Sequence, residues 1–289
     1  MHLIDRIAKI SRREKVMEKI NTGTEHLIFE KQNGVAILTM NRPDARNAMS
    51  GEMNEAMKNA LEEVELDSDV RCVVLTGAGK GFCAGGDVKG MASSGDGTVG
   101  SNTIDAAIHR QRVQQRATSG KLYKMPKPTL AALPGAAAGA GLSYALACDL
   151  RVMARNAIMT TAFAKVGFSG DYGGSYFMTQ LIGSAKAREL YFLSDRVTAE
   201  EALKLGLTNW VCEPEELMDK TMEIADQLAK GPSVAYRYMK ENLNRATHGE
   251  VDDCLDLEAT HHIHCGQTED HRNATKAFVE KKDPIFQGK

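Results

Sequence analysis

The chain has 289 residues, of which 43% are hydrophobic and 26% are charged, and its formal net charge is −2 at pH 7. This length suits one large domain or two small ones, and the apolar fraction is typical of a globular protein with a substantial core. The near-neutral charge gives no global basic field, so we expect no nucleic-acid partner; no apolar run is long enough to span a membrane, so we expect no membrane partner.

The cysteines and histidines show no metal-site pattern. The six cysteines lack the spacing of a metal site or a disulfide framework, which favours reduced thiols in a cytoplasmic protein. They are Cys72, Cys83, Cys148, Cys212, Cys254 and Cys265. His261, His262 and His264 lie beside Cys265, but no second ligand group accompanies them, so we interpret them as a helix with mixed faces and expect no metal.

Residues 1–25 are charged and helix-prone, and they contain Asp5, Glu14 and Glu18 without a continuous apolar segment. This composition argues against a secretory signal, and the acidic residues weaken a transit-peptide interpretation. We expect a helical or flexible arm ahead of the domain.

The first regular elements are two strands and a helix. Residues 26–32 and 34–43 resemble strands joined at Asn33 and Gly34, a hairpin signal. Residues 50–67 carry a helical stripe with Ser50 as the N-cap. The apolar members of that stripe are Met53, Met57, Leu61 and Val64.

A glycine-rich loop follows the next strand. Residues 71–77, RCVVLTG, predict a buried strand that runs directly into GKGFCAGGDVKGM, residues 79–91. A loop with so few large side chains exposes its backbone N–H groups, which suit an anionic oxygen and suggest an oxyanion hole. Residues 88–103 then predict a mobile loop, and residues 104–123 a helix.

The remaining pattern predicts an α/β protein. Residues 127–135 indicate a strand, 136–149 a helix of small residues, and 151–154 with 157–161 further strands. From about residue 184 the pattern is wholly helical, with a capping box at Thr198 and Glu201. We therefore place the sheet-bearing core at residues 26–190 and a helical region at 191–289.

Four blocks in this order resemble the crotonase (enoyl-CoA hydratase/isomerase) superfamily. They are NRPDARNAMS, LTGAGKGFCAGGDVKGM, LPGAAAGAGLSYALACDLRV and AFVEKKDPIF, and the resemblance covers nearly all of the chain except the N-terminal arm. It implies the ClpP/crotonase fold, a spiral of ββα units whose helical C-terminal region builds trimers, often paired as hexamers. It also implies an acyl-CoA thioester as substrate, with coenzyme A part of that substrate and no separate cofactor.

The resemblance assigns the two oxyanion donors to the backbone N–H groups of Gly86 and Ala140. Chemistry beside a thioester moves charge onto its carbonyl oxygen, and two fixed N–H donors stabilise that charge more than the ground-state carbonyl. Ala140 also starts the predicted helix, so its N–H lies at the positive end of the helix dipole. On residue pattern alone, both positions would equally suit tight turns and close packing.

The expected acid and base groups differ from those of the hydratases. The resemblance places the two hydratase glutamates at Ser143 and Phe163, neither of which can deprotonate water. A carboxylate appears instead at Asp171, and residues 160–183 and 255–289 resemble the ring-1,2-epoxyphenylacetyl-CoA isomerase subgroup, in which one aspartate here moves the proton. Dehalogenases and some hydrolases of the superfamily also place an aspartate at this site.

Asp171 therefore has a catalytic and a structural interpretation. Neighbouring Phe163, Phe168 and Tyr172 would partly desolvate its carboxyl group and raise its pKa towards useful basicity. The residue pattern equally permits Asp171 as the N-cap of a helix that begins near Gly174.

The family also implies contacts to the substrate. Backbone groups near Ala45 and Arg46 and the stretch from Ala84 to Lys89 would face coenzyme A, and Lys281 would meet phosphate from an adjoining subunit. Lys89 and Lys281 could equally be solvated surface lysines, and Asp87 suits loop fixation better than reaction. The full set of predicted substrate-binding residues is Ala45, Arg46, Ala84, Asp87, Lys89, Ser143, Phe163, Tyr172 and Lys281.

The favoured hypothesis is an acyl-CoA isomerase with Asp171 as proton shuttle and Gly86 with Ala140 as oxyanion hole. The alternative is an enoyl-CoA hydratase or thioester hydrolase that uses Asp171 on water, aided by Ser143 or Tyr172. A less favoured hypothesis, prompted by the absent glutamates and the basic arm, is a non-catalytic acyl-CoA-binding or RNA-binding protein.

Overall fold

The computed structural model describes residues 17–87 and 103–289, and these form an α/β structure with two sheets, as the sequence predicts. The larger sheet has the order β1-β2-β3-β4-β6-β8-β11 and the smaller one the order β10-β9-β7-β5. The larger sheet comprises β1 (Glu18–Ile20), β2 (Leu27–Gln32), β3 (Val35–Met40), β4 (Cys72–Gly77), β6 (Thr129–Leu133), β8 (Leu150–Ala154) and β11 (Trp210–Cys212). The smaller sheet comprises β5 (Gly81–Cys83), β7 (Ala136–Ala138), β9 (Ile158–Thr160) and β10 (Val197–Thr198).

The predicted hairpin at the start of the sheet is confirmed. Strands β2 and β3 are antiparallel, and the turn between them holds Asn33 and Gly34 at φ of 52° and 79°, values that glycine and asparagine adopt at low cost. From β3 onward the large sheet is parallel through β4, β6, β8 and β11. Every residue of β4 and β6 is buried, which explains why these strands are continuous apolar runs rather than alternating ones.

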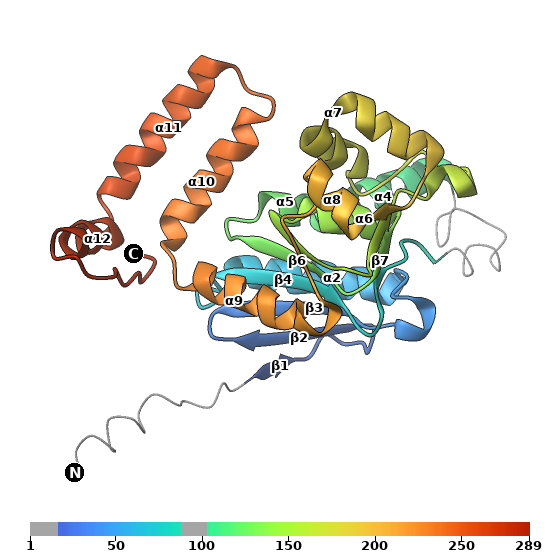
Figure 1. Ribbon diagram of the computed structural model, residues 1–289, viewed down its shortest axis with the longest axis horizontal. Coiled ribbons are helices and arrows are strands. Elements are labelled where there is room, and N and C mark those ends of the chain that lie inside the picture. Colours follow the sequence, from blue (N-terminus) through green and yellow to red (C-terminus); the bar gives the residue numbers. More distant parts are fainter. Residues whose placement is uncertain (1–16, 88–102) are drawn as a thin grey trace, which may run out of the picture.

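Helices cover the sheets and extend beyond them (Figure 1). Helix α9 packs over β3, β4, β6 and β8, while α6 lies against α7, α5 and the small sheet. Figure 1 shows α10 and α11 as two long antiparallel helices standing beside the sheet-bearing body, with α12 at their base. The helices are α2 (Gly51–Leu66), α4 (Ile104–Ala117), α5 (Ser119–Lys124), α6 (Ala140–Ala147), α7 (Gly174–Leu193), α8 (Ala199–Leu205), α9 (Leu217–Ala229), α10 (Ser233–Ala246), α11 (Val251–Gly266) and α12 (Glu269–Val279). The described residues also form three short 3₁₀ helices: η1 (Pro43–Ala45), η2 (Phe163–Val166) and η3 (Pro214–Glu216).

Local sequence signals determine where several of these helices begin and end. Ser50 accepts a hydrogen bond from the N–H of Met53 and so caps α2 as predicted, and the predicted stripe on α2 is buried. The capping box of Thr198 and Glu201 starts α8, and Gly206 ends it in a left-handed conformation.

Four expectations about the elements are wrong. The helix expected at residues 136–149 begins only at Ala140, because residues 136–138 pair as β7 with β5 and β9. The wholly helical pattern after residue 184 is interrupted by β10 and by β11, which pairs with β8 and so extends the large sheet past residue 190. Glu18–Ile20, placed in the helical or flexible arm, form β1 because the outer edge of β2 offers unpaired backbone groups. The helix expected at 104–123 is broken at Thr118, whose φ and ψ of −120° and −91° are non-helical.

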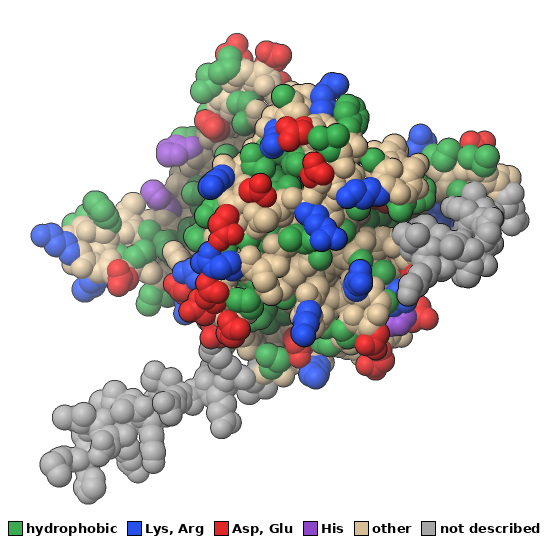
Figure 2. Space-filling model, turned by 45° about the vertical axis from the view of Figure 1, so that its right-hand side comes forward, with side chains coloured by type: hydrophobic (Ala, Val, Ile, Leu, Met, Phe, Trp, Pro, Cys, Tyr) green, Lys and Arg blue, Asp and Glu red, His purple; other side chains and the backbone are tan. Residues whose placement is uncertain are grey.

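The surface is mixed in charge. Figure 2 shows acidic and basic side chains interspersed on one face, without a large area of a single sign. Within residues 17–87 and 103–289, no helix has the length and apolarity needed to cross a membrane.

Candidate active site

The first predicted donor, Gly86, lies in the loop after β5, and main-chain bonds attach this loop to residues 45–49. The N–H of Met49 donates to the oxygen of Gly85 at 2.8 Å, and the N–H of Ala84 donates to the oxygen of Arg46 at 3.0 Å. The structure therefore brings together Ala45, Arg46 and Ala84, three of the residues predicted to face coenzyme A.

Two polar side chains, those of Asn47 and Arg42, hydrogen-bond to this loop and to the segment that precedes it. Asn47 is fully buried, and its amide nitrogen donates to the oxygens of Ala78 and Gly81. Both terminal guanidinium nitrogens of Arg42 donate to Asp87. Asp87 thus forms an ion pair that holds the loop, which agrees with loop fixation as its expected role.

The second predicted donor, Ala140, is the first residue of α6, as expected. Gly139 precedes it with φ of 53° and ψ of −127°, a conformation that requires glycine. A Cβ atom added at Gly85 would lie 2.9 Å from the oxygen of Ala138 and 3.2 Å from the nitrogen of Ala140. One added at Gly141 would lie 2.3 Å from the oxygen of Cys83. The two glycine loops therefore touch through their main chains.

The N–H groups of Gly86 and Ala140 have no hydrogen-bond acceptor within the described part of the chain. At Ala140 this follows from its place in the first turn of a helix, where N–H groups lack an intrahelical partner. Two unused N–H donors on touching loops, one of them at a helix N-terminus, form an arrangement that suits an anionic oxygen.

Asp171 precedes α7 and does not cap it. The N-cap of α7 is Gly173, and no side chain caps this helix, so the structural interpretation of Asp171 is wrong. One carboxylate oxygen, Oδ1, is buried with no hydrogen-bond partner among the described residues. Burial without compensation disfavours the charged form and raises the pKa of Asp171 from 3.8 to about 6.

The main chain of Asp171 is anchored to the donor loop by Ser143. The hydroxyl of Ser143, one turn into α6, lies 3.0 Å from the oxygen of Asp171 and 3.3 Å from the oxygen of Gly139. The carboxylate loop and the donor loop therefore meet at one hydroxyl group. Because this hydroxyl is bound to backbone carbonyls, the geometry favours a structural role for Ser143 over activation of water.

Aromatic side chains surround this region. Phe163 is buried and stacks on Tyr191 with ring centroids 5.9 Å apart, and its ring lies 3.6 Å from the Cβ position of Gly139. Tyr172 is buried and meets the ring of Tyr144 edge to face. Burial first, and then the charge of Asp171, raises the pKa of the Tyr172 and Tyr191 hydroxyls, so these two tyrosines lie near this carboxyl group. Phe168, also expected beside Asp171, is 55% exposed.

The two predicted lysines differ in outcome. Lys89 lies outside the described residues. Lys281 follows α12, where its N–H donates to the oxygen of Phe278, and Figure 1 shows α12 far from α6 and α7 in the same chain.

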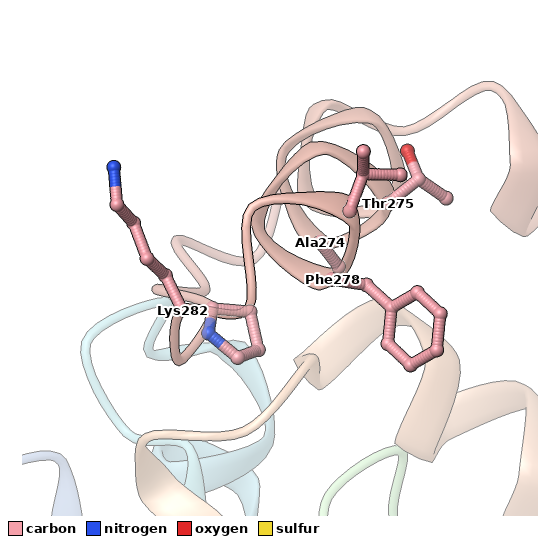
Figure 3. Close-up of a pocket in the computed structure, with 6 residues that line it drawn as sticks. Ala274, Thr275, Phe278 and Lys282 are labelled. Carbon is pink, nitrogen blue, oxygen red and sulfur yellow. The ribbon is translucent and has the colours of Figure 1, made fainter.

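Beside Lys281, α12 borders an apolar hollow of about 530 Å³; Figure 3 shows Phe278 on this helix and Lys282 extending away from it.

Of the clustered histidines, only His261 is packed between α10 and α11, while His262 and His264 are exposed. His261 is buried, and its ring stacks on that of Tyr238 at 4.2 Å. Its nitrogens face Asn242 Oδ1 and Glu241 Oε2 at 2.5 and 3.4 Å. Within the described residues, no group of three or more His, Cys, Asp and Glu side chains could hold a metal ion.

Some residues of the site have no clear signal in the sequence. Arg42 and Asn47 lie in NRPDARNAMS, the first of the four family blocks, so the sequence shows that these residues are present. It does not show which residues they bind. Gln115 accepts a hydrogen bond from the N–H of Tyr172, and Tyr191 stacks on Phe163. Neither residue lies in a motif, and only the three-dimensional packing identifies them.

Comparisons with known proteins agree with this geometry. Residues 30–289 match the family model described as enoyl-CoA hydratase/isomerase. The chain is 34% identical over 265 residues to the 1,2-epoxyphenylacetyl-CoA isomerase of Escherichia coli K12, which covers 92% of this chain and 99% of that protein. It is 35% identical over 261 residues to the short-chain-enoyl-CoA hydratase of Clostridium acetobutylicum, which covers 89% and 95% of the two chains.

Solved structures show the same similarity. The crystal structure of an enoyl-CoA hydratase from Polaromonas sp. JS666 superposes with a TM-score of 0.84 and 30% sequence identity, covering 90% of this chain and 99% of that one. The structural similarity therefore extends over most of the chain.

Proposed function

Because the chain belongs to the enoyl-CoA hydratase/isomerase family and has the crotonase fold, we propose that it is an isomerase of acyl-CoA thioesters. The family resemblance stated from the sequence is confirmed, and a 1,2-epoxyphenylacetyl-CoA isomerase is among the similar proteins. The reaction is our proposal, because relatives named as an isomerase and as a hydratase are almost equally similar to the chain.

The proposal depends above all on the buried Oδ1 oxygen of Asp171, which has no hydrogen-bond partner among the described residues. The Ser143 hydroxyl contacts the main-chain oxygens of both Asp171 and Gly139, which supports a carboxylate close to the donors Gly86 and Ala140. A raised pKa lets it both accept and return a proton near neutral pH. Ser143 and Phe163 occupy the positions at which the family resemblance implies the two hydratase glutamates.

The proposed mechanism moves one proton between two carbon atoms. The thioester oxygen binds to the N–H groups of Gly86 and Ala140, and Asp171 removes a proton from a carbon of the acyl chain. The electrons of the broken C–H bond move into an enolate whose oxygen the two donors stabilise. Asp171 then returns the proton to a different carbon, so the double bond shifts and no water is consumed.

The runner-up reaction uses the same groups on water. An enoyl-CoA hydratase or thioester hydrolase would need a water molecule between Asp171 and the substrate, and the similarity to a short-chain-enoyl-CoA hydratase supports this alternative. The hydroxyl of Ser143 does not favour it, because backbone carbonyls already occupy that group.

Incubation with 3-enoyl-CoA and with 2-enoyl-CoA separates the two reactions. We expect interconversion of the two substrates and its loss in Asp171→Asn. Asn has nearly the shape of Asp but cannot accept the proton. Hydration of 2-enoyl-CoA without isomerisation of 3-enoyl-CoA would contradict the isomerase proposal in favour of the hydratase.

We also propose that the protein forms trimers or hexamers in the cytoplasm. Large apolar side chains are exposed on the C-terminal helices, including Leu243, Val251 and Phe278, which are 69%, 70% and 84% exposed. Such exposure on a single chain is typical of an association surface. Assembly would also be needed for Lys281 to meet a substrate in another subunit. Sedimentation equilibrium tests this proposal, and a monomeric mass would contradict it.

A further inference from the structure

Helix α4 is attached to its neighbours in part through polar side chains. None of the described residues of α4 is buried, although the helix contacts α2 and α5. Its attachment includes two adjacent glutamines. Gln114 donates to the oxygen of Asn54 on α2, and Gln115 accepts from the N–H of Tyr172 at 2.5 Å.

The N–H of Tyr172 and the C=O of Asp171 belong to one peptide group. Ser143, from α6, donates to its oxygen, and Gln115, from α4, accepts from its N–H. Side chains from two helices therefore clamp both ends of the peptide that directly follows the Cα atom of Asp171. The plane of this peptide sets the backbone torsion of Asp171, and so the direction in which its carboxyl group extends.

This peptide would not adopt its orientation unaided. Tyr172 has φ of 48°, a left-handed conformation that is unfavourable for a bulky residue with a Cβ atom. Such a conformation persists only where the surroundings hold it in place, and these cases cluster at functional sites. Without the Gln115 acceptor, the N–H of Tyr172 would be unpaired in a buried region, and the loop could relax.

We propose that Gln115 is a positioning residue, which aims the Asp171 carboxylate at the substrate by fixing the Asp171–Tyr172 peptide group. The inference depends on the proposed function in one respect, namely that Asp171 moves the proton. Gln115 itself touches no reacting atom. The alternative is that Gln115 only attaches α4 to the protein, in which case its loss would affect folding but not the carboxylate.

Gln115→Met tests the proposal, because Met preserves the length of the side chain and removes the acceptor. A displacement of about 1 Å at a reacting group can reduce the rate about a hundredfold, so we expect kcat for 3-enoyl-CoA to fall between about tenfold and a hundredfold. KM should change little, since the donors Gly86 and Ala140 are untouched. Gln114→Met is the matched control, with an expected kcat equal to that of the wild type.

Gln115→Glu supplies the rescue. Glu retains an acceptor oxygen at the same distance along the chain, so at pH 8 we expect it to restore most of the kcat that Gln115→Met loses. If Gln115→Glu and Gln115→Met lose equal activity, the acceptor has no role and the proposal is overturned.

A second variant guards against misfolding of Gln115→Met. Ser143→Ala releases the other end of the same peptide group, so its effect on kcat should not multiply with that of Gln115→Met: once one clamp is lost, loss of the other matters less. Independent, multiplicative losses would overturn the shared-peptide inference.

Titration of the Asp171 carboxyl carbon by NMR gives a readout that needs no turnover. We expect Gln115→Met to lower the pKa of Asp171 towards its ordinary value, because the released carboxylate gains water. An unchanged pKa and kcat in Gln115→Met would overturn the proposal. If the wild type isomerises no substrate but this pKa falls in Gln115→Met, the proposed function fails while the positioning role of Gln115 stands.

Discussion

Arg42 binds Asp87 through both of its terminal guanidinium nitrogens, each 3.1 Å from the same carboxylate oxygen. Asp87 directly follows the proposed donor Gly86, and Arg42 also donates to the oxygen of Ala48 at 2.7 Å. The ion pair thereby connects the loop of the first donor to the segment that supports it. Its side chains are only partly buried, so its contribution to global stability should be modest.

Arg42→Leu should therefore impair catalysis more than folding. Loss of one oxyanion donor costs about a hundredfold or more in kcat, and a loosened donor should cost less, about tenfold. Steady-state kinetics and thermal unfolding measure the two effects. Arg155→Leu is the control, since Arg155 forms an exposed ion pair with Glu213 away from the site, and it should leave kcat unchanged. A large loss of stability with normal kcat in Arg42→Leu would contradict this role.

The rate should depend on the ionisation of Asp171. Burial raises the pKa of this carboxyl group to about 6, and a proton acceptor must be ionised. We expect kcat to rise with pH through about 6 and to level off above it. Stopped-flow or steady-state rates between pH 4.5 and 8 provide the check, and a rate that is flat or falling across this range would exclude Asp171 as the base.

The same burial of Asp171 should lower the free energy of unfolding at pH values above the folded-state pKa of its carboxyl group. The unfolded Asp ionises near its ordinary pKa of 3.8, whereas the folded one ionises near 6, so the folded state binds more protons between these values. Stability therefore falls as pH rises through this window, and the full penalty of about 3 kcal/mol persists above it. At pH below 3.8 both states are protonated, and the penalty disappears.

Asp171→Asn should accordingly be inactive yet more stable than the wild type at pH 7.5. The gain should approach the full penalty, less whatever the Asn amide loses by burial, and it should shrink as the pH falls from 6 towards 4. Urea unfolding at several pH values measures it. A gain independent of pH would show that the carboxylate is not strained by desolvation.

Gly174 should resist substitution because of its neighbours. A Cβ atom there would lie 2.3 Å from Ser143 Oγ and 2.7 Å from the Tyr191 hydroxyl. Gly174→Ala must displace the start of α7, and overpacking of this kind costs about 1 to 3 kcal/mol. Gly266→Ala is the control, because nothing lies within 4 Å of its Cβ position, and it should be neutral or stabilising. Chemical denaturation distinguishes the two.

Lys240 should anchor α10 to the sheet-bearing body. Its buried amine donates to the oxygens of Leu122 and Lys127 and to Asp149 at 2.8 Å. Removal of one partner from a buried pair costs about 3 to 5 kcal/mol, and we expect a loss towards the lower end for Lys240→Met because Asp149 is partly exposed. Hydrogen exchange should accelerate in α10. Arg237→Met, on the exposed face of the same helix, should change neither quantity.

The sequence predicted what depends on local pattern. The hairpin at Asn33 and Gly34 and the buried β4 follow from turn chemistry and apolar runs that neighbouring residues specify. It missed β11, whose three residues are only half-buried and too short to show a period. It also did not reveal that Phe168 is 55% exposed, because position in the chain does not show how deeply a side chain is buried.

The candidate site likewise contains residues that the sequence identified and residues that it could not identify. Gly86, Ala140 and Asp171 were identified from family blocks, and the raised pKa of Asp171 followed from its aromatic neighbours. The supports could not be identified, because each joins residues far apart in the chain: Arg42 and Asp87 are 45 residues apart, and Gln115 and Tyr172 are 57 apart. Such pairs leave no periodic or composition signal, and one chain without its relatives offers no covariation.

The contact between Gly141 and the main chain of Cys83 has a consequence for how this scaffold can be altered. The spacing of the two donors depends in part on this contact of backbone against backbone. The peptide group that follows Asp171, in contrast, is held by a hydroxyl and a side-chain amide, each of which a single codon change can remove. Laboratory evolution should therefore be able to move or replace the proton-transferring group while the two donors continue to bind the thioester oxygen. The donor pair would then be retained in variants in which Asp171 is exchanged.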